Sequence, residues 1–110
     1  MTTIVIDGIE YVKKDITTDY VIVRGDRAST FAGEMVKHDG REVTLRNARR
    51  LWYWSGAASL SQLAMQGVSN PAECKFPCEV KEVIILDAVE IIYTTPVARK
   101  SIEGVPVWEK

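Results

Sequence analysis

The chain has 110 residues, of which 46% are hydrophobic and 26% are charged, and its formal net charge is −1. This size predicts one domain with a modest core, and the apolar runs are too short to span a membrane. The near-neutral charge argues against a broad nucleic-acid interface, which needs a basic domain. Asp7 and Glu10 stand where a secretion signal has basic residues and then a long apolar run, so we expect a cytosolic protein.

Most of the predicted elements are strands. Asp7-Gly8 and Asp39-Gly40 each separate two runs rich in β-branched or alternating residues, which is the pattern of a β-hairpin. Gly33 interrupts one such run and predicts a bulge or a bend. In chain order, the predicted strands cover residues 3–6, 9–12, 20–24, 30–37, 41–46, 51–54, 79–86 and 88–93.

Capping signals predict two short helices. Ser59 is a good N-cap, Gln62 completes a capping box, and Gly67 is a C-terminal stop. Thr95 followed by Pro96 predicts a second helix over residues 96–103, because proline is favoured at the first helical position.

These elements predict a single α+β domain over residues 1–110. Residues 1–14 would form an N-terminal β-hairpin. Residues 20–108 would form the core, a small bent antiparallel or barrel-like sheet with two short helices. Bent strands of this kind are similar to parts of the SH3-like and Sm-like folds.

The segment from Arg46 to Met65 is the most informative stretch of the chain. Arginine grips phosphate or carboxylate with two parallel hydrogen bonds, and aromatic faces stack on flat rings. Backbone amides at a helix start can bind an anion. Six of the seven arginines lie within residues 21–54, which favours a local anion site. The candidate binding residues for an anionic ligand with a flat ring are Arg46, Asn47, Arg49, Arg50, Trp52, Trp54 and Ser59.

Each part of this segment also has a structural interpretation. The arginines can mark a basic strand end with water-exposed heads, and such exposed arginines carry little stability. Trp52 and Trp54 can pack in the core or in a subunit interface. Ser59 can simply cap an ordinary helix.

The sequence contains no recognisable catalytic or metal motif. Ser59 and Ser61 have no histidine nearby, and His38 is the only histidine. Cys74 and Cys78 form a single C-x3-C pair, whereas a zinc site needs four ligands at motif spacing. We therefore expect no enzyme activity, no cofactor, no metal and two buried, reduced thiols. The enzyme alternative is a hydrolase that acts on the same ligand.

The run RNARRLWYWSGAASLSQLAM at residues 46–65, with Cys74-Lys-Phe-Pro77 and Val105-Pro-Val-Trp108, resembles a family of small proteins of tailed phages and prophages. The resemblance covers residues 20–108, and the hairpin at residues 1–14 is an addition to it. The family has no assigned function. The resemblance implies a phage protein that resides in the cytoplasm of the infected bacterial host.

Phage origin directs the functional expectation. Small phage proteins include non-enzymatic sponges that bind and hide nucleotide signals of bacterial immunity. We expect this chain to sequester a nucleotide-type ligand of the cyclic nucleotide or cyclic ADP-ribose class. We also expect a homo-oligomer with a tryptophan in its interface and neither membrane nor nucleic acid as a partner. The alternative is a structural or host-protein interaction module with no small-molecule ligand.

Overall fold

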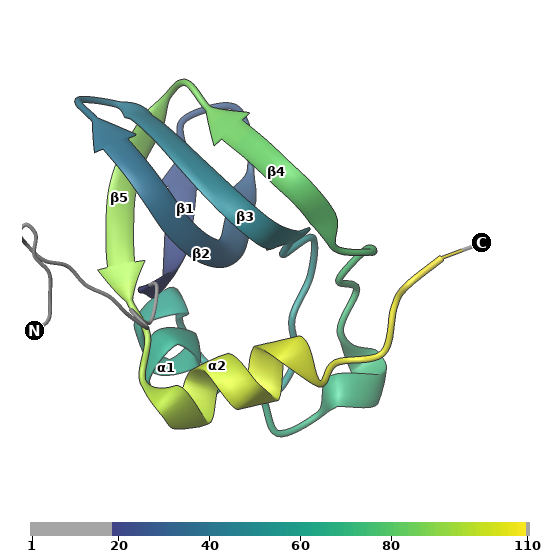
Figure 1. Ribbon diagram of the computed structural model, residues 1–110. Helices are drawn as coiled ribbons and strands as arrows, with labels where there is room; N and C mark the ends of the chain where they lie inside the picture. Colours follow the sequence, from purple (N-terminus) through teal and green to yellow (C-terminus); the bar gives the residue numbers. More distant parts are fainter. Residues whose placement is uncertain (1–18, 110) are drawn as a thin grey trace, which may run out of the picture.

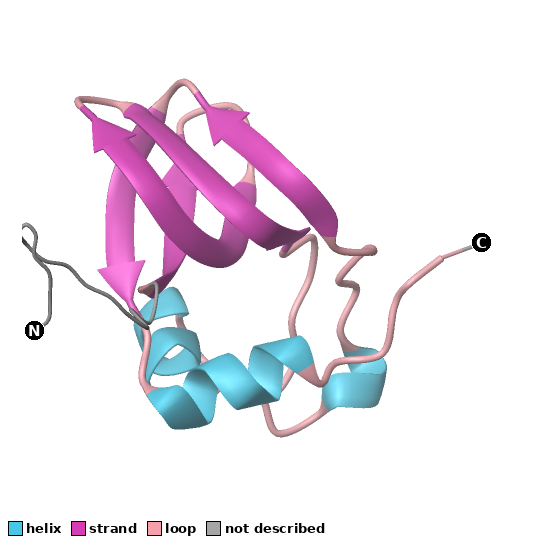
Figure 2. Ribbon diagram, viewed as in Figure 1, coloured by secondary structure: helices cyan, strands magenta, loops and turns pink. Residues whose placement is uncertain are grey.

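The computed structural model describes residues 19–109, which fold into one antiparallel sheet with helices packed below it (Figures 1 and 2). The predicted hairpin at residues 1–14 lies outside the described residues. The strands are β1 (Tyr20–Gly25), β2 (Thr30–Asp39), β3 (Glu42–Arg50), β4 (Val80–Ile85) and β5 (Ala88–Tyr93). The helices are α1 (Leu60–Gln66), α2 (Pro96–Glu103) and the short 3-10 turn η1 (Pro71–Glu73).

The sheet curls because of its strand order, β4-β3-β2-β1-β5. β4 and β5 lie at opposite ends of this order, yet only Leu86 and Asp87 connect them. The two outer strands must therefore approach each other at this turn. The Ala88 N–H donates to Arg41 O over 3.0 Å, and the Asp26 N–H donates to Asp87 O over 2.9 Å. The expected small α+β fold with a bent antiparallel sheet is confirmed, and the sheet is not closed into a barrel.

Two glycines shape the β2–β3 hairpin. Gly40 follows Asp39 in the turn with φ +60, a left-handed conformation that glycine adopts without strain. Gly33 lies where the register of β2 against β3 shifts, between Ala32 and Glu34. A Cβ atom at Gly33 would lie 2.9 Å from Ala48 Cβ, so glycine permits the close approach of β3. The predicted turn and bend are both confirmed.

Alternating residues of the sheet enter two apolar cores. Val43 and Leu45 point inward and are fully buried, as the alternation of their strand predicts. One core lies within the curl of the sheet and contains Val21, Val23, Phe31, Val43, Leu45, Ala48, Ile85 and Ala88. The other core joins the sheet to the helices and contains Tyr20, Ile22, Ala32, Leu51, Leu63, Ala64, Cys74, Phe76, Ile102 and Val105.

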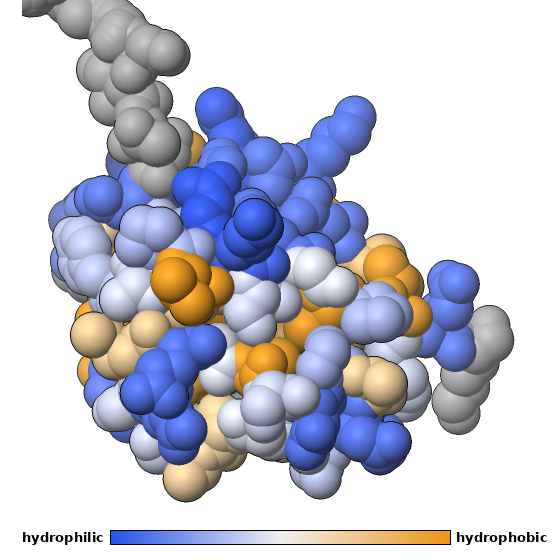
Figure 3. Space-filling model, turned by 90° about the horizontal axis from the view of Figure 1, so that it is seen from below, coloured by the Kyte–Doolittle hydropathy of each residue, from blue (hydrophilic) through white to orange (hydrophobic). Residues whose placement is uncertain are grey.

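Both predicted helices are confirmed with their caps. Ser59 Oγ accepts the Gln62 N–H over 3.1 Å, and Gln62 Oε1 accepts the Ala58 N–H over 2.8 Å. Thr95 Oγ1 accepts the Ala98 N–H over 3.1 Å at the start of α2. Seen from below, the end of the molecule that carries the helices is largely hydrophilic with separate apolar spots (Figure 3). None of the helices between residues 19 and 109 is long and apolar enough to cross a membrane.

The predicted strand over residues 51–54 is wrong. β3 instead continues to Arg50, with Asn47 at φ +50 marking an irregular point in it. The chain then leaves the sheet and makes a single antiparallel bridge, from Tyr53 to Lys75. Strand propensity alone could not show that this segment pairs with Lys75 and not with the sheet. Trp52, at the start of the segment, is 61% exposed.

Candidate functional site

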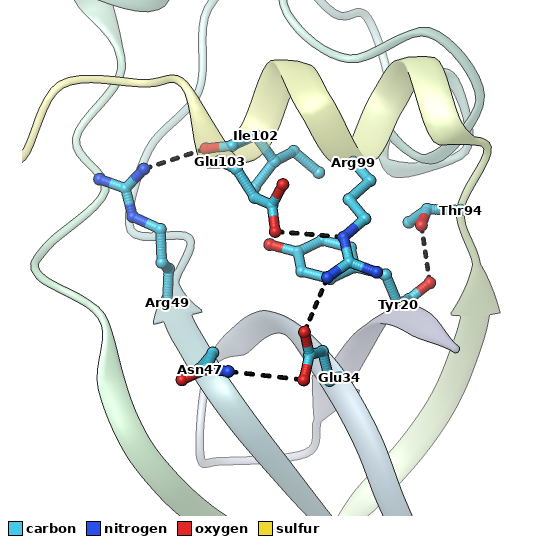
Figure 4. Close-up of polar contacts among 8 residues, drawn as sticks. All are labelled: Tyr20, Glu34, Asn47, Arg49, Thr94, Arg99, Ile102 and Glu103. Carbon is cyan, nitrogen blue, oxygen red and sulfur yellow. Dashed lines mark hydrogen bonds and ion pairs between the residues drawn. The ribbon is translucent and has the colours of Figure 1, made fainter. Parts of the chain in front are cut away.

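The fold separates the candidate residues of β3 instead of gathering them into one site. Arg46 is exposed on the outer face of the sheet, with its Nε 3.5 Å from Glu82 Oε1. The Asn47 side chain donates to Glu34 Oε1 over 3.4 Å (Figure 4). Both side chains therefore take part in cross-strand contacts.

Arg49 is part of the core. Arg49 is only 3% exposed, so the alternative interpretation of the arginines as water-exposed heads does not hold for this residue. Nε, Nη1 and Nη2 all donate to backbone carbonyls, and Figure 4 shows the bond to Ile102 at the end of α2. Burial lowers the pKa of Arg49. The five acceptors, at 2.7–3.4 Å, are the carbonyls of Phe76, Pro77, Ile102, Val105 and Pro106.

A second arginine, which the sequence analysis did not single out, joins α2 to the sheet. Arg99 Nη2 donates to Glu34 Oε2 over 2.7 Å, and its Nε donates to Glu103 Oε2 over 3.1 Å (Figure 4). The same guanidinium lies 4.8 Å from the centroid of the Tyr20 ring. Asn47 thus belongs to a network that fastens α2 to the sheet through Glu34.

Arg50 lies at the wall of an open groove. Its guanidinium lies 4.4 Å from the centroid of the Phe31 ring and donates to Ala28 O over 2.9 Å. The groove has a volume of about 550 Å³ and runs between the outer strand β4 and the loop that follows β1. Its lining residues are Arg27, Ala28, Phe31, Arg50, Val83, Ile84, Ile85, Leu86 and Asp87.

The groove combines positive charge with an apolar wall. Within residues 19–109, neither Arg27 nor Arg50 forms an ion pair. Asp87 is the one acidic residue of the lining, and its Oδ2 accepts the Arg27 backbone N–H over 2.7 Å. Its Oδ1 is buried and has no hydrogen-bond partner among residues 19–109. Arg27 and Arg50 thus place two positive charges in the lining of the groove.

The remaining candidate residues lie outside this groove. Trp54 packs against the core between sheet and helices, and Ser59 caps α1. Trp52 is exposed and does not line the groove. Arg50 is thus the only residue of the predicted set in the groove lining. Sequence analysis missed Arg27 and Phe31, because β2 and the loop before it reach Arg50 only through strand pairing.

The two cysteines differ in environment. Cys74 is buried and its Sγ accepts the Ser55 N–H over 3.4 Å. Cys78 is exposed, which contradicts the expectation of two buried thiols. Cys78 follows Pro77 in the loop that leads to β4, outside both cores. Across the described part of the chain, no group of three histidine, cysteine or acidic residues could hold a metal ion.

Comparison with known proteins places the chain in a family. No curated protein and no solved structure matches it significantly. A family model described as a domain of unknown function (DUF6948) matches residues 18–102, which is more than half of the chain. The match begins just before β1 and ends within α2, so it covers the sheet, both groove walls and most of the arginine network. The chain therefore belongs to the DUF6948 family.

Proposed function

We propose that this protein binds and sequesters a nucleotide-type immune signal in the groove beside β4. The ligand would belong to the cyclic nucleotide or cyclic ADP-ribose class. The protein would act without catalysis, as a phage anti-defence protein in the cytoplasm of the infected bacterial host. The observation that carries the proposal is a groove that places two arginines, neither of them ion-paired within residues 19–109, beside an aromatic ring and an apolar strand.

The arginines provide the anion-binding part of the proposal. A phosphate that reaches Arg27 and Arg50 would receive charge-assisted hydrogen bonds from planar guanidinium groups. Arg50 already stacks on Phe31 and donates to Ala28 O, so its position is fixed before a ligand arrives. This preorganisation reduces the entropy that binding costs.

The apolar wall provides the contact for the rest of the ligand. Val83, Ile85 and Leu86 border the groove next to Phe31. A nucleobase is flat and largely apolar on its faces, so it can bury those faces against such side chains. A volume of about 550 Å³ falls within the ordinary range of small-molecule sites.

The residue types in the groove lining favour binding of the ligand without a chemical reaction. Within the described part of the chain, the lining residues include two arginines and one aspartate but no serine, cysteine or histidine. Asp87 already accepts the backbone N–H of Arg27. A site of this composition binds an anion without offering it a nucleophile.

A binding screen tests the proposal. The ligands are cyclic mononucleotides, cyclic dinucleotides and cyclic ADP-ribose isomers, with inorganic phosphate and linear mononucleotides as controls. At a hundredfold excess over its Kd, a ligand should stabilise the fold by about 2.7 kcal/mol, visible as a raised Tm. Chromatography of the recovered ligand should show it chemically unchanged. No shift with any member of the panel, or conversion of the ligand, contradicts the proposal.

The second candidate function is a structural or host-protein interaction module. Exposed aromatic side chains support it, because Trp52 and Tyr53 are 61% and 52% exposed and such residues are enriched in protein interfaces. Purified virions probed for this chain distinguish the two functions. A fixed copy number per virion would favour the module, and absence from virions together with ligand binding would favour sequestration.

A further inference from the structure

Exposed side chains gather on a small ribbon that lies outside the main sheet. Tyr53 forms an antiparallel bridge to Lys75, and Phe76 forms a parallel bridge to Val107. The Trp108 N–H also donates to Phe76 O over 3.0 Å. Phe76 is fully buried and anchors this ribbon to the core. The exposed residues of the ribbon, called the aromatic patch below, are Trp52, Tyr53, Lys75, Val107 and Trp108.

A cation joins two rings of the patch. Lys75 Nζ lies 5.8 Å from the centroid of the Tyr53 ring and 5.6 Å from that of the Trp108 ring. Within residues 19–109, Lys75 forms no ion pair. Cation–π attraction therefore holds the two rings and the ammonium group together as one surface.

We propose that the aromatic patch is the interface of a symmetric homodimer, whose occupant is a second copy of this chain. Trp52, Tyr53 and Trp108 are 61%, 52% and 37% exposed. At 150–250 Å² per aromatic side chain, they present on the order of 350 Å² of aromatic surface. A standard interface buries about 800 Å² per partner, a little over half of it apolar. With Val107, the patch supplies most of the apolar area that a dimer needs.

The charges of the ribbon are complementary to those of a second copy, which favours a second copy over an unrelated partner. Glu73 lies two residues before Lys75, and Glu109 follows Trp108, and both are exposed. The patch thus carries a cation that is not ion-paired within residues 19–109, with acidic groups on the same segments. A two-fold axis sets one patch against its own copy, so the Lys75 of one copy can meet an acidic group of the other.

Light scattering of the full chain, without nucleotide, tests this interface. The expected mass is twice the 12.3 kDa of one chain. Tyr53→Ala combined with Trp108→Ala should weaken dimerisation at least tenfold, and Lys75→Glu should also weaken it. Val97→Ala is the matched control, since Val97 is 68% exposed on α2 and lies outside the patch. Circular dichroism verifies that each variant is folded.

Two outcomes overturn the homodimer. One is a wild-type chain that stays at 12.3 kDa up to millimolar concentration, which would assign the patch to a different protein. The other is a dimer that folded Tyr53→Ala/Trp108→Ala leaves unchanged, which would place the interface elsewhere. Because the measurement contains no nucleotide, its failure is separate from failure of the proposed ligand binding.

Discussion

Arg49 Nη1 donates to the carbonyl of Val105 over 2.7 Å, which ties β3 to the segment that follows α2. The same nitrogen also donates to Ile102 O over 3.0 Å, near the end of that helix. The last carbonyls of a helix lack partners within it, and a cation near them also complements the helix dipole. Arg49 therefore stabilises the contact between the sheet and α2.

Arg49→Ala should destabilise the fold strongly. The substitution removes the side-chain donor of five carbonyls, of which Phe76 O and Ile102 O keep a backbone N–H donor. A hydrogen bond to a charged group contributes about 1.5–3 kcal/mol. We expect the free energy of unfolding to fall by roughly 3–5 kcal/mol, because each buried acceptor that is left unsatisfied costs about 1–3 kcal/mol. Urea denaturation measures the change.

Arg46→Ala is the control, since Arg46 is exposed and its one side-chain contact within residues 19–109 is a long one to Glu82. Its effect should stay within about 1 kcal/mol, as for exposed ion pairs generally. Equal losses in the two variants would contradict the structural role of Arg49. Arg49 is consequently unsuitable as a probe of ligand binding, because its loss damages the fold.

Local signals in the sequence predicted much of the fold. The Ser59–Gln62 capping box and the Thr95-Pro96 start act within a few residues, so both helices could be predicted with their boundaries. The role of Arg49 could not be predicted, because its acceptors lie 27 to 57 residues away along the chain. The groove could not be predicted from the sequence for the same reason. Phe31 faces Arg50 only because β2 and β3 pair in one particular register.

Gly33→Ala should destabilise the protein more than a change at the exposed hairpin turn. The new methyl group would lie 2.9 Å from Ala48 Cβ and 3.1 Å from Arg46 O, so the β3 backbone would have to shift. Overpacking of this kind costs about 1–3 kcal/mol. Thermal unfolding measures the difference.

Gly40→Asn provides the comparison for Gly33→Ala. Gly40 has φ +60, and a Cβ atom added there would have no neighbouring atom within 4 Å. Asparagine also tolerates left-handed backbone better than most residues. Its cost should therefore stay below about 1 kcal/mol, as expected where no packing is disturbed. A larger loss at Gly40 than at Gly33 would argue against the close β2–β3 approach.

Tyr20→Phe should be neutral or stabilising near pH 7. Among residues 19–109 the buried Tyr20 hydroxyl has no hydrogen-bond partner, and an unsatisfied buried polar group costs about 1–3 kcal/mol. Burial, followed by the negative charge of Glu103, raises the pKa of Tyr20 well above its usual value. The contact with Arg99 persists in the variant because phenylalanine keeps the ring.

The raised pKa also predicts a pH dependence of stability. The folded state keeps the Tyr20 phenol protonated to higher pH than the unfolded chain does. Protonation of Tyr20 therefore contributes fully to the free energy of unfolding below the unfolded pKa of about 10, and this contribution is lost as pH rises toward the pKa of the folded state. Wild type should therefore lose stability above pH 10 faster than Tyr20→Phe. Urea midpoints at pH 8 and pH 10.5 measure the two slopes. Parallel slopes would show that Tyr20 ionises as easily in the folded state as in the unfolded chain.

The two thiols should react at different rates. Cys78 is exposed, so iodoacetamide should modify it in the native protein. Cys74 is buried and accepts the Ser55 N–H, so it should react only after unfolding. Intact-mass spectrometry should find one label on the native chain and two on the denatured chain. Cys78→Ser should abolish the native label, and rapid labelling of Cys74 in that variant would contradict its burial.

Arg50→Ala and Arg27→Ala should separate ligand binding from stability. Each loses a guanidinium that lines the groove and forms no ion pair within the described chain, so Arg27→Ala should change stability by no more than about 1 kcal/mol. Arg50→Ala also loses an exposed hydrogen bond to Ala28 O and the contact with the Phe31 ring, so its free energy of unfolding should fall by about 1–2 kcal/mol. Loss of a charged hydrogen bond to phosphate costs about 1.5–3 kcal/mol, which raises Kd roughly 10- to 150-fold. Calorimetric titration with the best ligand of the nucleotide panel measures this change. Arg46→Ala, on the outer face of the sheet, should bind as wild type does. If all three variants bind equally well, the ligand does not occupy the groove, and the protein-interaction function becomes the better account of this fold.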